Sequence, residues 1–248
     1  MVAKATKISI IVPAHNEEEN LVHLLAEIEE QLHGLPPTEV VLVCDHCTDN
    51  TQYEASVLSS SYGFLKVIVN DGPKGMGNSL KKGAACSNGD ILAFVMADVT
   101  CPLSALRPML DVLAEKRCDM VIFSRYVEPG HSANLPLRYR ISSRLYRIMA
   151  KTLVGIRVND ITDGFRVVTR RAYLQNIPSR GDFSFSAELT FKAWLNGFRI
   201  CEFPGRQRMR TRGKSSFSFR RMAHPYASVL LAAMVTRIVR RLFPRVFF

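Results

Sequence analysis

The sequence predicts an α/β fold with a mostly parallel central sheet and helices on both of its faces. Short apolar runs typical of buried parallel strands alternate with helical patterns through the first half of the chain. Such alternation indicates strands joined by crossover helices. The chain has 248 residues, 47% of them hydrophobic, which is enough for one large domain with a substantial core.

Strands are predicted wherever a short apolar run is bounded by turn residues. In chain order these runs are residues 8–12, 40–44, 65–69, 91–96 and 120–124, with two shorter strands at 166–169 and 199–203. The helix predicted at 17–32 places Leu21, Leu24, Leu25 and Ile28 at helical spacing. Further helices are expected from about residue 49, at 79–85, after Pro102 and over 136–154.

The C-terminal segment differs in composition from the rest of the chain. We expect a main domain over residues 1–221 and a basic, amphipathic segment over 222–248, in which the apolar run 229–235 precedes several arginines. No stretch reaches the roughly 18 to 20 uncharged apolar residues of a membrane-spanning helix. The segment is therefore expected to lie on an anionic membrane surface. A helix packed on the domain, or an oligomer contact, is the alternative.

Charge and cysteine content narrow the class of protein. The net charge of +11 suggests an anionic partner, although it could serve solubility alone. The basic residues lack interleaved aromatic residues, so no nucleic-acid partner is expected. The N-terminus shows no secretory signal, and the six cysteines fall mostly in or beside apolar runs. A reducing, cytoplasmic location, peripheral at the membrane, is the simplest expectation.

Polar loops follow the predicted strands, at the edge where open α/β sheets bind ligands. Asp98 follows the apolar run 91–96 and stands where a metal or a phosphate ligand would be held. The polar loops, in chain order, are 12–17, 43–51, 72–78, 96–100, 124–126, 160–166, 185–188 and 210–216.

Together and in this order, these loops resemble glycosyltransferase family 2, and within it the dolichol-phosphate mannose synthase group of polyprenyl-phosphate glycosyltransferases. The resemblance runs from about residue 8 to residue 216. It implies a GT-A type nucleotide-sugar-binding domain. It also implies an inverting enzyme that moves a sugar from a nucleotide-sugar, such as GDP-mannose or UDP-glucose, to a dolichyl or undecaprenyl phosphate.

The resemblance implies where the nucleoside would bind. Pro13, His15 and Glu17 match the loop that holds the base and ribose, and Val43 and Asp45 match a second contact of this kind. A ribose diol is well held by a carboxylate that accepts two hydrogen bonds, because an ionised carboxylate is an acceptor only. That chemistry suits Asp45 or Glu17.

The resemblance also implies a divalent metal, Mg²⁺ or Mn²⁺, that neutralises the departing diphosphate. Ala97 and Asp98 match the metal-binding DxD loop, and Thr100 sits where that loop often offers a further ligand. Met96 replaces the first aspartate, and a thioether is a poor ligand for a hard cation. Weaker metal binding, metal-independent catalysis and loss of activity all follow as possible consequences.

Arginines and one further carboxylate complete the implied catalytic set of Asp98, Arg125, Glu188 and Arg210. Arg125 and Arg210 match donor-binding arginines, since arginine fits phosphate with a planar fork. Lys214 follows the second arginine in the same loop, and Glu188 matches an acidic residue facing the acceptor.

The helix predicted at 136–154 carries Arg140, Arg144, Arg147 and Lys151 on one face. A lipid phosphate is already an anionic nucleophile, because its second pKa is about 6. It therefore needs basic groups to hold it rather than a strong general base. The three arginines are candidates for the acceptor phosphate, and a solvated surface is the alternative.

Other functions are suggested by departures from the family. Cys44 and His46-Cys47 replace family residues around Asp45, and this CxxC could be a redox site or half of a zinc site. Met96 is also consistent with a catalytically impaired relative that binds a nucleotide or a lipid as a regulatory subunit.

Overall fold

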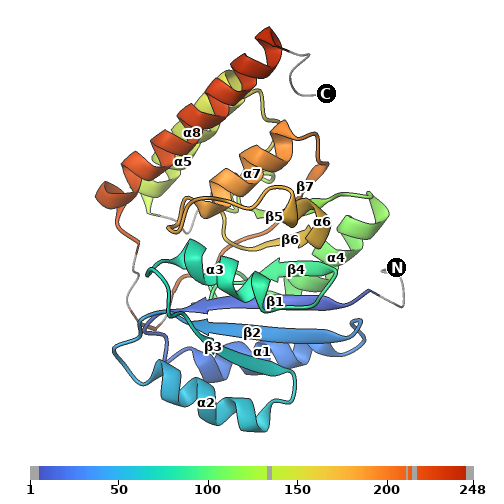
Figure 1. The fold of residues 1–248 in the computed structure, drawn as a ribbon, viewed down its shortest axis with the longest axis vertical. Helices are drawn as coiled ribbons and strands as arrows, with labels where there is room; N and C mark the ends of the chain where they lie inside the picture. The colour runs from blue at the N-terminus through green and yellow to red at the C-terminus, as the bar shows by residue number, and fades with distance from the viewer. Residues whose placement is uncertain (1–5, 133–135, 211, 214–216, 244–248) are drawn as a thin grey trace.

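A computed structural model describes residues 6–132, 136–210, 212–213 and 217–243. Its centre is a seven-stranded sheet in the order β3-β2-β1-β4-β6-β5-β7 (Figure 1). The strands are β1 Ile8–Ala14, β2 Thr38–Cys44, β3 Leu65–Val69, β4 Ile91–Phe94, β5 Met120–Ser124, β6 Arg166–Thr169 and β7 Ile200–Pro204. Within the described residues, β6 alone runs antiparallel to its neighbours, β4 and β5. The predicted mostly parallel sheet is therefore confirmed.

Helices cover both faces of this sheet, as the sequence predicted. The helices are α1 Leu21–Leu32, α2 Thr51–Ser61, α3 Met76–Ala85, α4 Leu106–Glu115, α5 Leu137–Leu153, α6 Arg170–Leu174, α7 Phe185–Leu195 and α8 Phe219–Leu242. A short 3₁₀ turn, Leu103–Ala105, precedes α4. Side chains of α1, α2 and α4 join one apolar cluster, and those of α3 and α5–α8 join the cluster on the opposite face.

The C-terminal helix differs from its prediction in length. It begins at Phe219, three residues before the predicted segment that starts at residue 222. By length and composition α8 could cross a membrane, and only 17% of its most apolar window is buried inside the protein. Val229, Leu230 and Ala233 are the buried residues of α8, and they belong to the core.

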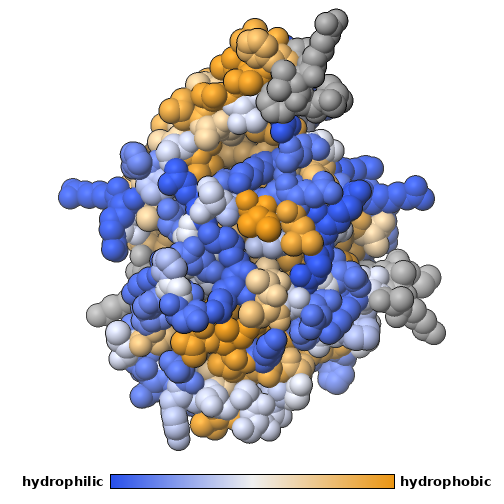
Figure 2. Space-filling view, in the orientation of Figure 1, coloured by the Kyte–Doolittle hydropathy of each residue, from blue (hydrophilic) through white to orange (hydrophobic). Residues whose placement is uncertain are grey.

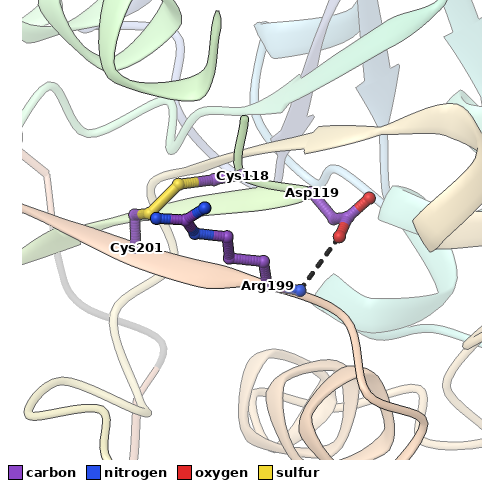
Figure 3. Close-up of a disulfide and its surroundings, with 4 residues drawn as sticks. All are labelled: Cys118, Asp119, Arg199 and Cys201. Carbon is purple, nitrogen blue, oxygen red and sulfur yellow. Dashed lines mark hydrogen bonds between the residues drawn. A yellow bond between two sulfur atoms is a disulfide. The ribbon is translucent and has the colours of Figure 1, made fainter. Parts of the chain in front are cut away.

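The strands β5 and β7 are joined by a disulfide that the sequence analysis did not anticipate. Cys118 precedes β5, Cys201 lies in β7, and their Cα atoms are 6.1 Å apart although 83 residues separate them in sequence (Figure 3). Nearby, Arg199 N donates to Asp119 Oδ2 at 2.9 Å. Reduced cysteines were expected throughout, but the parallel pairing of β5 with β7 brings these two side chains together.

Candidate donor site and buried arginine network

The carboxyl ends of β1, β2 and β4 bring three predicted donor loops to one edge of the sheet. These strands are parallel neighbours and end at Ala14, Cys44 and Phe94. This is the edge at which ligands bind in open α/β sheets.

Asp45 is buried among the predicted base-and-ribose loops. Its Oδ1 accepts a hydrogen bond from Asn70 Nδ2 at 2.8 Å and lies 2.9 Å from His46 Nδ1, while Oδ2 accepts from Gly75 N at 2.8 Å. Burial opposes ionisation of Asp45, but these hydrogen bonds outweigh it and hold the pKa below its usual value. Gly75 has φ 145°, and a Cβ there would lie 2.3 Å from the Gly181 carbonyl oxygen, so glycine is required. Asp45 thus ties the loop after β3 to the sheet edge.

The other predicted nucleoside contacts lie around this carboxylate. Pro13 and Val43 belong to β1 and β2, and Val43 is fully buried. His15 Nδ1 lies 2.7 Å from the Asp45 carbonyl oxygen, and His15 Nε2 lies 3.0 Å from Lys74 Nζ. His15 is half-buried and Lys74 is exposed, so both are more accessible than the buried Asp45.

Arg210 connects the nucleoside loop to the predicted metal loop. Its Nη2 lies 2.7 Å from Glu17 Oε2, and its Nη1 lies 3.5 Å from Asp98 Oδ2. Asn20 Nδ2 donates to the same Glu17 oxygen at 2.6 Å. Burial raises the pKa of Glu17 even though Arg210 opposes the shift. One guanidinium therefore satisfies two carboxylates from different strand ends.

Asp98 is arranged so that it could hold a divalent cation together with substrate phosphates. Thr100 donates to Asp98 Oδ1 from its backbone N at 3.2 Å and from Oγ1 at 2.9 Å, while Oδ2 faces the Arg210 guanidinium. The fit rests on that guanidinium, which shows that a cation is accommodated at this oxygen. One carboxylate with donor phosphates and water is a usual Mg²⁺ environment. Among the described residues, no group of three or more metal-ligating side chains occurs.

Met96 begins this loop and is half-buried. Its side chain packs against the apolar cluster under α3 and α7. A Cβ at Gly164 would come within 3.1 Å of the Met96 sulfur, so the two residues are in close contact. Ala97 is buried in the cluster on the opposite face. The position that carries an aspartate in the family is thus filled here by packed apolar atoms.

Arg125, which the resemblance implied as a donor-binding arginine, lies in a buried ion pair. Its Nε and Nη2 donate to the two oxygens of Asp160 at 2.6 and 2.8 Å, and Nη2 also donates to Thr162 Oγ1 at 3.0 Å. Its side chain is 11% exposed, and Asp160 is fully buried. Burial opposes ionisation of Asp160, but Arg125 outweighs it and keeps the pKa low. The guanidinium faces this carboxylate rather than open space.

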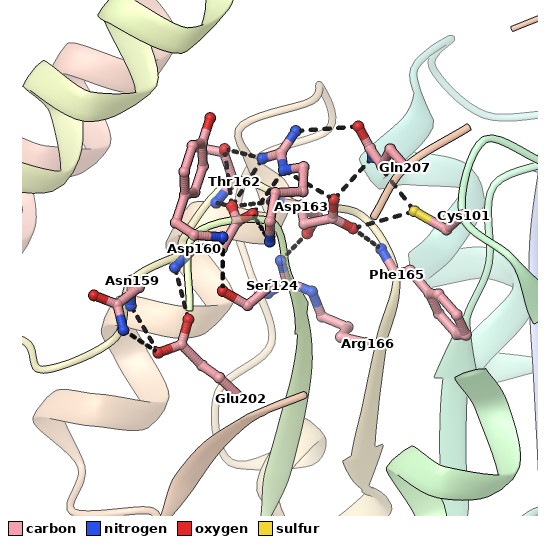
Figure 4. A network of polar contacts seen from close by, with 12 residues as sticks. Cys101, Ser124, Asn159, Asp160, Thr162, Asp163, Phe165, Arg166, Glu202 and Gln207 are labelled. Atoms are coloured by element: carbon pink, nitrogen blue, oxygen red, sulfur yellow. Dashed lines mark hydrogen bonds and ion pairs between the residues drawn. The ribbon is translucent and has the colours of Figure 1, made fainter. Parts of the chain in front are cut away.

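A second buried carboxylate, Asp163, extends this network (Figure 4). Its Oδ2 lies 3.4 Å from Arg125 Nε, and its Oδ1 accepts from Phe165 N at 2.8 Å. Burial raises the pKa of Asp163 to about 6, because Arg125 offsets only part of the cost of desolvation. The fully buried Arg166 donates to the Ser186 carbonyl at 2.7 Å. The sequence marked residues 160–166 as a polar loop but assigned none of these side chains a role.

Glu188 lies apart from the donor cluster. Its Oε1 accepts from Ser179 N and lies 2.9 Å from Lys192 Nζ, while Oε2 accepts from Arg180 N at 2.9 Å. Burial opposes its ionisation, yet the bonds from Ser179 and Arg180 lower the pKa. In the described part of the chain, no hydrogen bond joins Glu188 to Asp98, Arg125 or Arg210. Here it fixes the loop before α7 and lines a cavity of about 370 Å³ between α7 and α8.

The candidate acceptor arginines of α5 differ in their surroundings. Arg140 and Arg144 are exposed. The Cζ atom of Arg147 lies 5.0 Å from the centroid of the Tyr126 ring, and that of Arg125 lies 5.4 Å from the same centroid. The Tyr126 hydroxyl is buried and has no hydrogen-bond partner among the described residues. Lys214, the remaining predicted site residue, lies outside the described residues.

Comparisons with known proteins identify the family of this chain. The model of the family described as glycosyl transferase family 2 matches residues 9–176. A dolichol-phosphate mannosyltransferase from Pyrococcus furiosus is 28% identical over 242 residues, which cover 94% of this chain and 67% of that protein. A polyprenol monophosphomannose synthase from Mycolicibacterium smegmatis is 28% identical over 203 residues, covering 79% of this chain and 75% of that protein.

A solved structure shows the same fold. The crystal structure of glucosyl-3-phosphoglycerate synthase from Mycobacterium tuberculosis, in complex with Mn²⁺, uridine diphosphate and phosphoglyceric acid, superposes with a TM-score of 0.69. The two sequences are 19% identical, and the match covers 93% of this chain and 79% of that chain. With the GT-A type fold in place and the family model spanning more than half of the sequence, the chain belongs to glycosyl transferase family 2 and is a glycosyltransferase.

Proposed function

We propose that this glycosyltransferase moves a hexose from a nucleotide-sugar to a polyprenyl phosphate at a membrane surface. The observation that carries the proposal is the convergence of Glu17, Asp98 and Arg210 at the carboxyl edge of the sheet, in a chain 28% identical along 94% of its length to a dolichol-phosphate mannosyltransferase. The names of these relatives favour mannose over glucose. They also favour a catalyst over the impaired regulatory subunit.

On the donor side, Arg210 would exchange its carboxylate partners for the diphosphate. A guanidinium pairs with phosphate oxygens through a planar fork, and Glu17 would then be released toward the ribose. A bound Mg²⁺ or Mn²⁺ would supply additional positive charge for the departing diphosphate. Asp98 would hold that ion, and Thr100 orients the carboxylate.

On the acceptor side, the phosphate oxygen of the lipid would attack the anomeric carbon while the bond to the diphosphate breaks. The nucleoside diphosphate leaves with the bonding electron pair, and in-line attack inverts the anomeric centre. Of the three α5 arginines, Arg147 is the best supported candidate, because it is half-buried and lies over the Tyr126 ring, whereas Arg140 and Arg144 are exposed.

Two neighbouring helices offer a surface for lipid. α5 and α8 lie side by side, with Tyr146 Oη donating to the Tyr226 carbonyl at 3.2 Å and Arg237 Nη1 donating to the Leu153 carbonyl at 2.9 Å (Figure 1). Both helices expose large apolar side chains at helical spacing, and Figure 2 shows hydrophobic residues gathered over α8. These side chains are Leu137, Ile141, Leu145 and Ile148 of α5, and Leu231, Val235, Ile238 and Leu242 of α8. Apolar residues mixed with arginines suit an anionic bilayer, here on its cytoplasmic face.

The test is release of nucleoside diphosphate from GDP-mannose or UDP-glucose by the purified protein. Release should require both Mn²⁺ or Mg²⁺ and vesicles that contain polyprenyl phosphate, and glycosylated lipid should form in equal amount. Arg147→Ala should raise the KM for lipid phosphate about ten-fold, as expected for a charge-assisted contact of ~1.4 kcal/mol. The exposed Arg144→Ala is the matched control. Donor turnover that is independent of the lipid would overturn the proposal.

A further inference from the structure

The segment that follows β7 contains Arg210 and runs along the carboxyl edge of the sheet. Consecutive residues of this segment bind to the rest of the domain. Arg208 N donates to the Thr100 carbonyl at 2.7 Å. Because Thr100 also binds Asp98, this hydrogen bond holds the segment directly beside the predicted metal loop.

The side chain of Gln207 reaches from this segment into the buried network (Figure 4). Its Nε2 donates to Asp163 Oδ2 at 2.9 Å and approaches Cys101 Sγ at 3.3 Å. Its Oε1 accepts from Arg125 Nη1 at 3.5 Å. The amide thus meets a carboxylate with its donor and a guanidinium with its acceptor. Neither an acidic nor an apolar side chain could do both.

Neighbouring attachments of the same segment are weaker. Arg208 pairs with Glu27 at 3.0 Å, but its side chain is 52% exposed, and such surface pairs contribute little. Met209 is 71% exposed. A hydrogen bond to a buried carboxylate contributes more than an exposed pair, and an unsatisfied buried carboxylate is costly. Gln207 is therefore a stronger side-chain attachment than Arg208 or Met209, the two residues between it and Arg210.

We propose that Gln207 is a positioning residue that sets the place of Arg210 over Asp98 by fixing the segment after β7 to the buried Asp163. Its contribution to donor binding is indirect and acts through Arg210. The inference relies on the proposed function only for the identity of the donor, a nucleoside diphosphate sugar.

Exchanging the amide and the carboxylate between positions 207 and 163 tests this role. Gln207→Glu places a second carboxylate against Asp163 and breaks the attachment. Adding Asp163→Asn restores one amide and one carboxylate, because the introduced amide could accept from Phe165 N and donate to the new carboxylate. The net charge of the reversed pair equals that of the natural one. Met209→Gln is the matched control in the same segment.

Three measurements separate positioning from a general effect on folding. The first is the Kd of GDP and UDP with Mn²⁺, by calorimetry. The second is hydrogen exchange at the Arg208 amide in the protein without nucleotide. The third is the melting temperature. We expect Gln207→Glu to weaken nucleotide binding about ten-fold and to speed Arg208 exchange at least as much, and the reversed pair to restore both. In an Arg210→Ala background, Gln207→Glu should not weaken binding further.

Each outcome supports or overturns the positioning role of Gln207. A lower melting temperature with unchanged Kd and unchanged Arg208 exchange would show a merely structural glutamine and overturn the proposal. An additive loss in the Arg210→Ala background would do the same. If the natural protein bound neither nucleotide, the proposed function would fail, but Arg208 exchange and its recovery in the reversed pair would still decide the role of Gln207.

Discussion

The buried network around Arg125 and the cluster around Arg210 at the carboxyl edge of the sheet are both built from arginine and carboxylate groups, but they differ in exposure and geometry. Arg125 is 11% exposed and holds the fully buried Asp160 through contacts of 2.6 and 2.8 Å. Arg210 is 17% exposed and is shared between two half-buried carboxylates, with Glu17 Oε2 at 2.7 Å and Asp98 Oδ2 at 3.5 Å. A desolvated bidentate pair is costly to break, whereas a pair that water still reaches costs less to exchange for another anion. We therefore expect the first region to fix structure and the second to be available to a ligand.

Breaking the buried pair should have the largest effect. Asp160→Asn leaves the Arg125 guanidinium without its full counter-charge, and we expect a loss of about 3–5 kcal/mol in the free energy of unfolding. Urea denaturation measures this loss. Asp71→Asn, which removes an exposed partner of Lys82, is the control and should leave the midpoint unchanged. Equal urea midpoints for Asp160→Asn and Asp71→Asn would contradict the prediction that the buried pair is the more stabilising one.

The same pair predicts a pH dependence. The pKa of Asp160 is lower in the folded protein than in the unfolded chain, so its contribution is present above the unfolded value of about 3.9. That contribution is lost as pH falls through the folded pKa. The stability difference between the natural protein and Asp160→Asn should therefore shrink in acid.

Changing the half-buried cluster around Arg210 should instead reduce activity and leave the free energy of unfolding nearly unchanged. Asp98→Asn keeps the hydrogen bonds from Thr100 possible but removes the charge that would hold the metal. We expect turnover with Mn²⁺ to fall about a hundred-fold, or ~2.7 kcal/mol in activation free energy, while the urea midpoint stays constant. A loss of stability similar to that of Asp160→Asn would show that Asp98 stabilises the fold and would contradict this prediction.

Met96 combines features of both regions, because it begins the predicted metal loop and its half-buried side chain packs against the core. Met96→Asp places a half-buried carboxylate next to Gly164 and the apolar cluster. We expect the free energy of unfolding to fall by about 1–3 kcal/mol, with no gain in Mn²⁺-dependent turnover. Denaturation and steady-state assays across a Mn²⁺ titration test this. A large gain in turnover would show that the natural site lacks a ligand it can use.

The smallest expected effect is a difference in alkylation rate between one cysteine from each region. A hydrogen bond with Cys44 lowers the pKa of Cys47, near Asp45, to about 6, although burial opposes the shift. Burial raises the pKa of Cys101, which contacts the Arg125 network. At pH 7 iodoacetamide should modify Cys47 and spare Cys101, with the rate half-maximal near pH 6 for Cys47. Mass spectrometry with Cys86 as the internal reference checks this, and equal rates at Cys47 and Cys86 would refute it.

The strands of the fold were predictable because their apolar runs end at turn residues. The residues at which the helices begin and end were harder to predict. The first helix begins at Leu21 rather than residue 17, since Glu17 N donates to Thr51 Oγ1 at 2.8 Å and is held outside the helix. The helix α7 lacks a clear pattern because it is buried on most sides, and sequence periodicity cannot reveal a helix without a polar face.

Part of the site was also predictable. Glu17, Asp45 and Asp98 follow strands, so parallel pairing alone places them at one edge. Arg125 and Glu188 follow an equally good motif order, yet each is engaged with another part of the chain. A motif gives the position of a residue along the chain and not the partner of its side chain.

The sequence by itself determined the alternation of strands and helices, the ligand edge of the sheet and the family, because these depend on local patterns and on their order. Tertiary structure alone decided that Arg125 meets Asp160, 35 residues away, and that Arg210 meets Asp98, 112 residues away. It also decided that Cys118 faces Cys201. Such pairs depend on which strands lie side by side and how deeply each side chain is buried, and neither property is local.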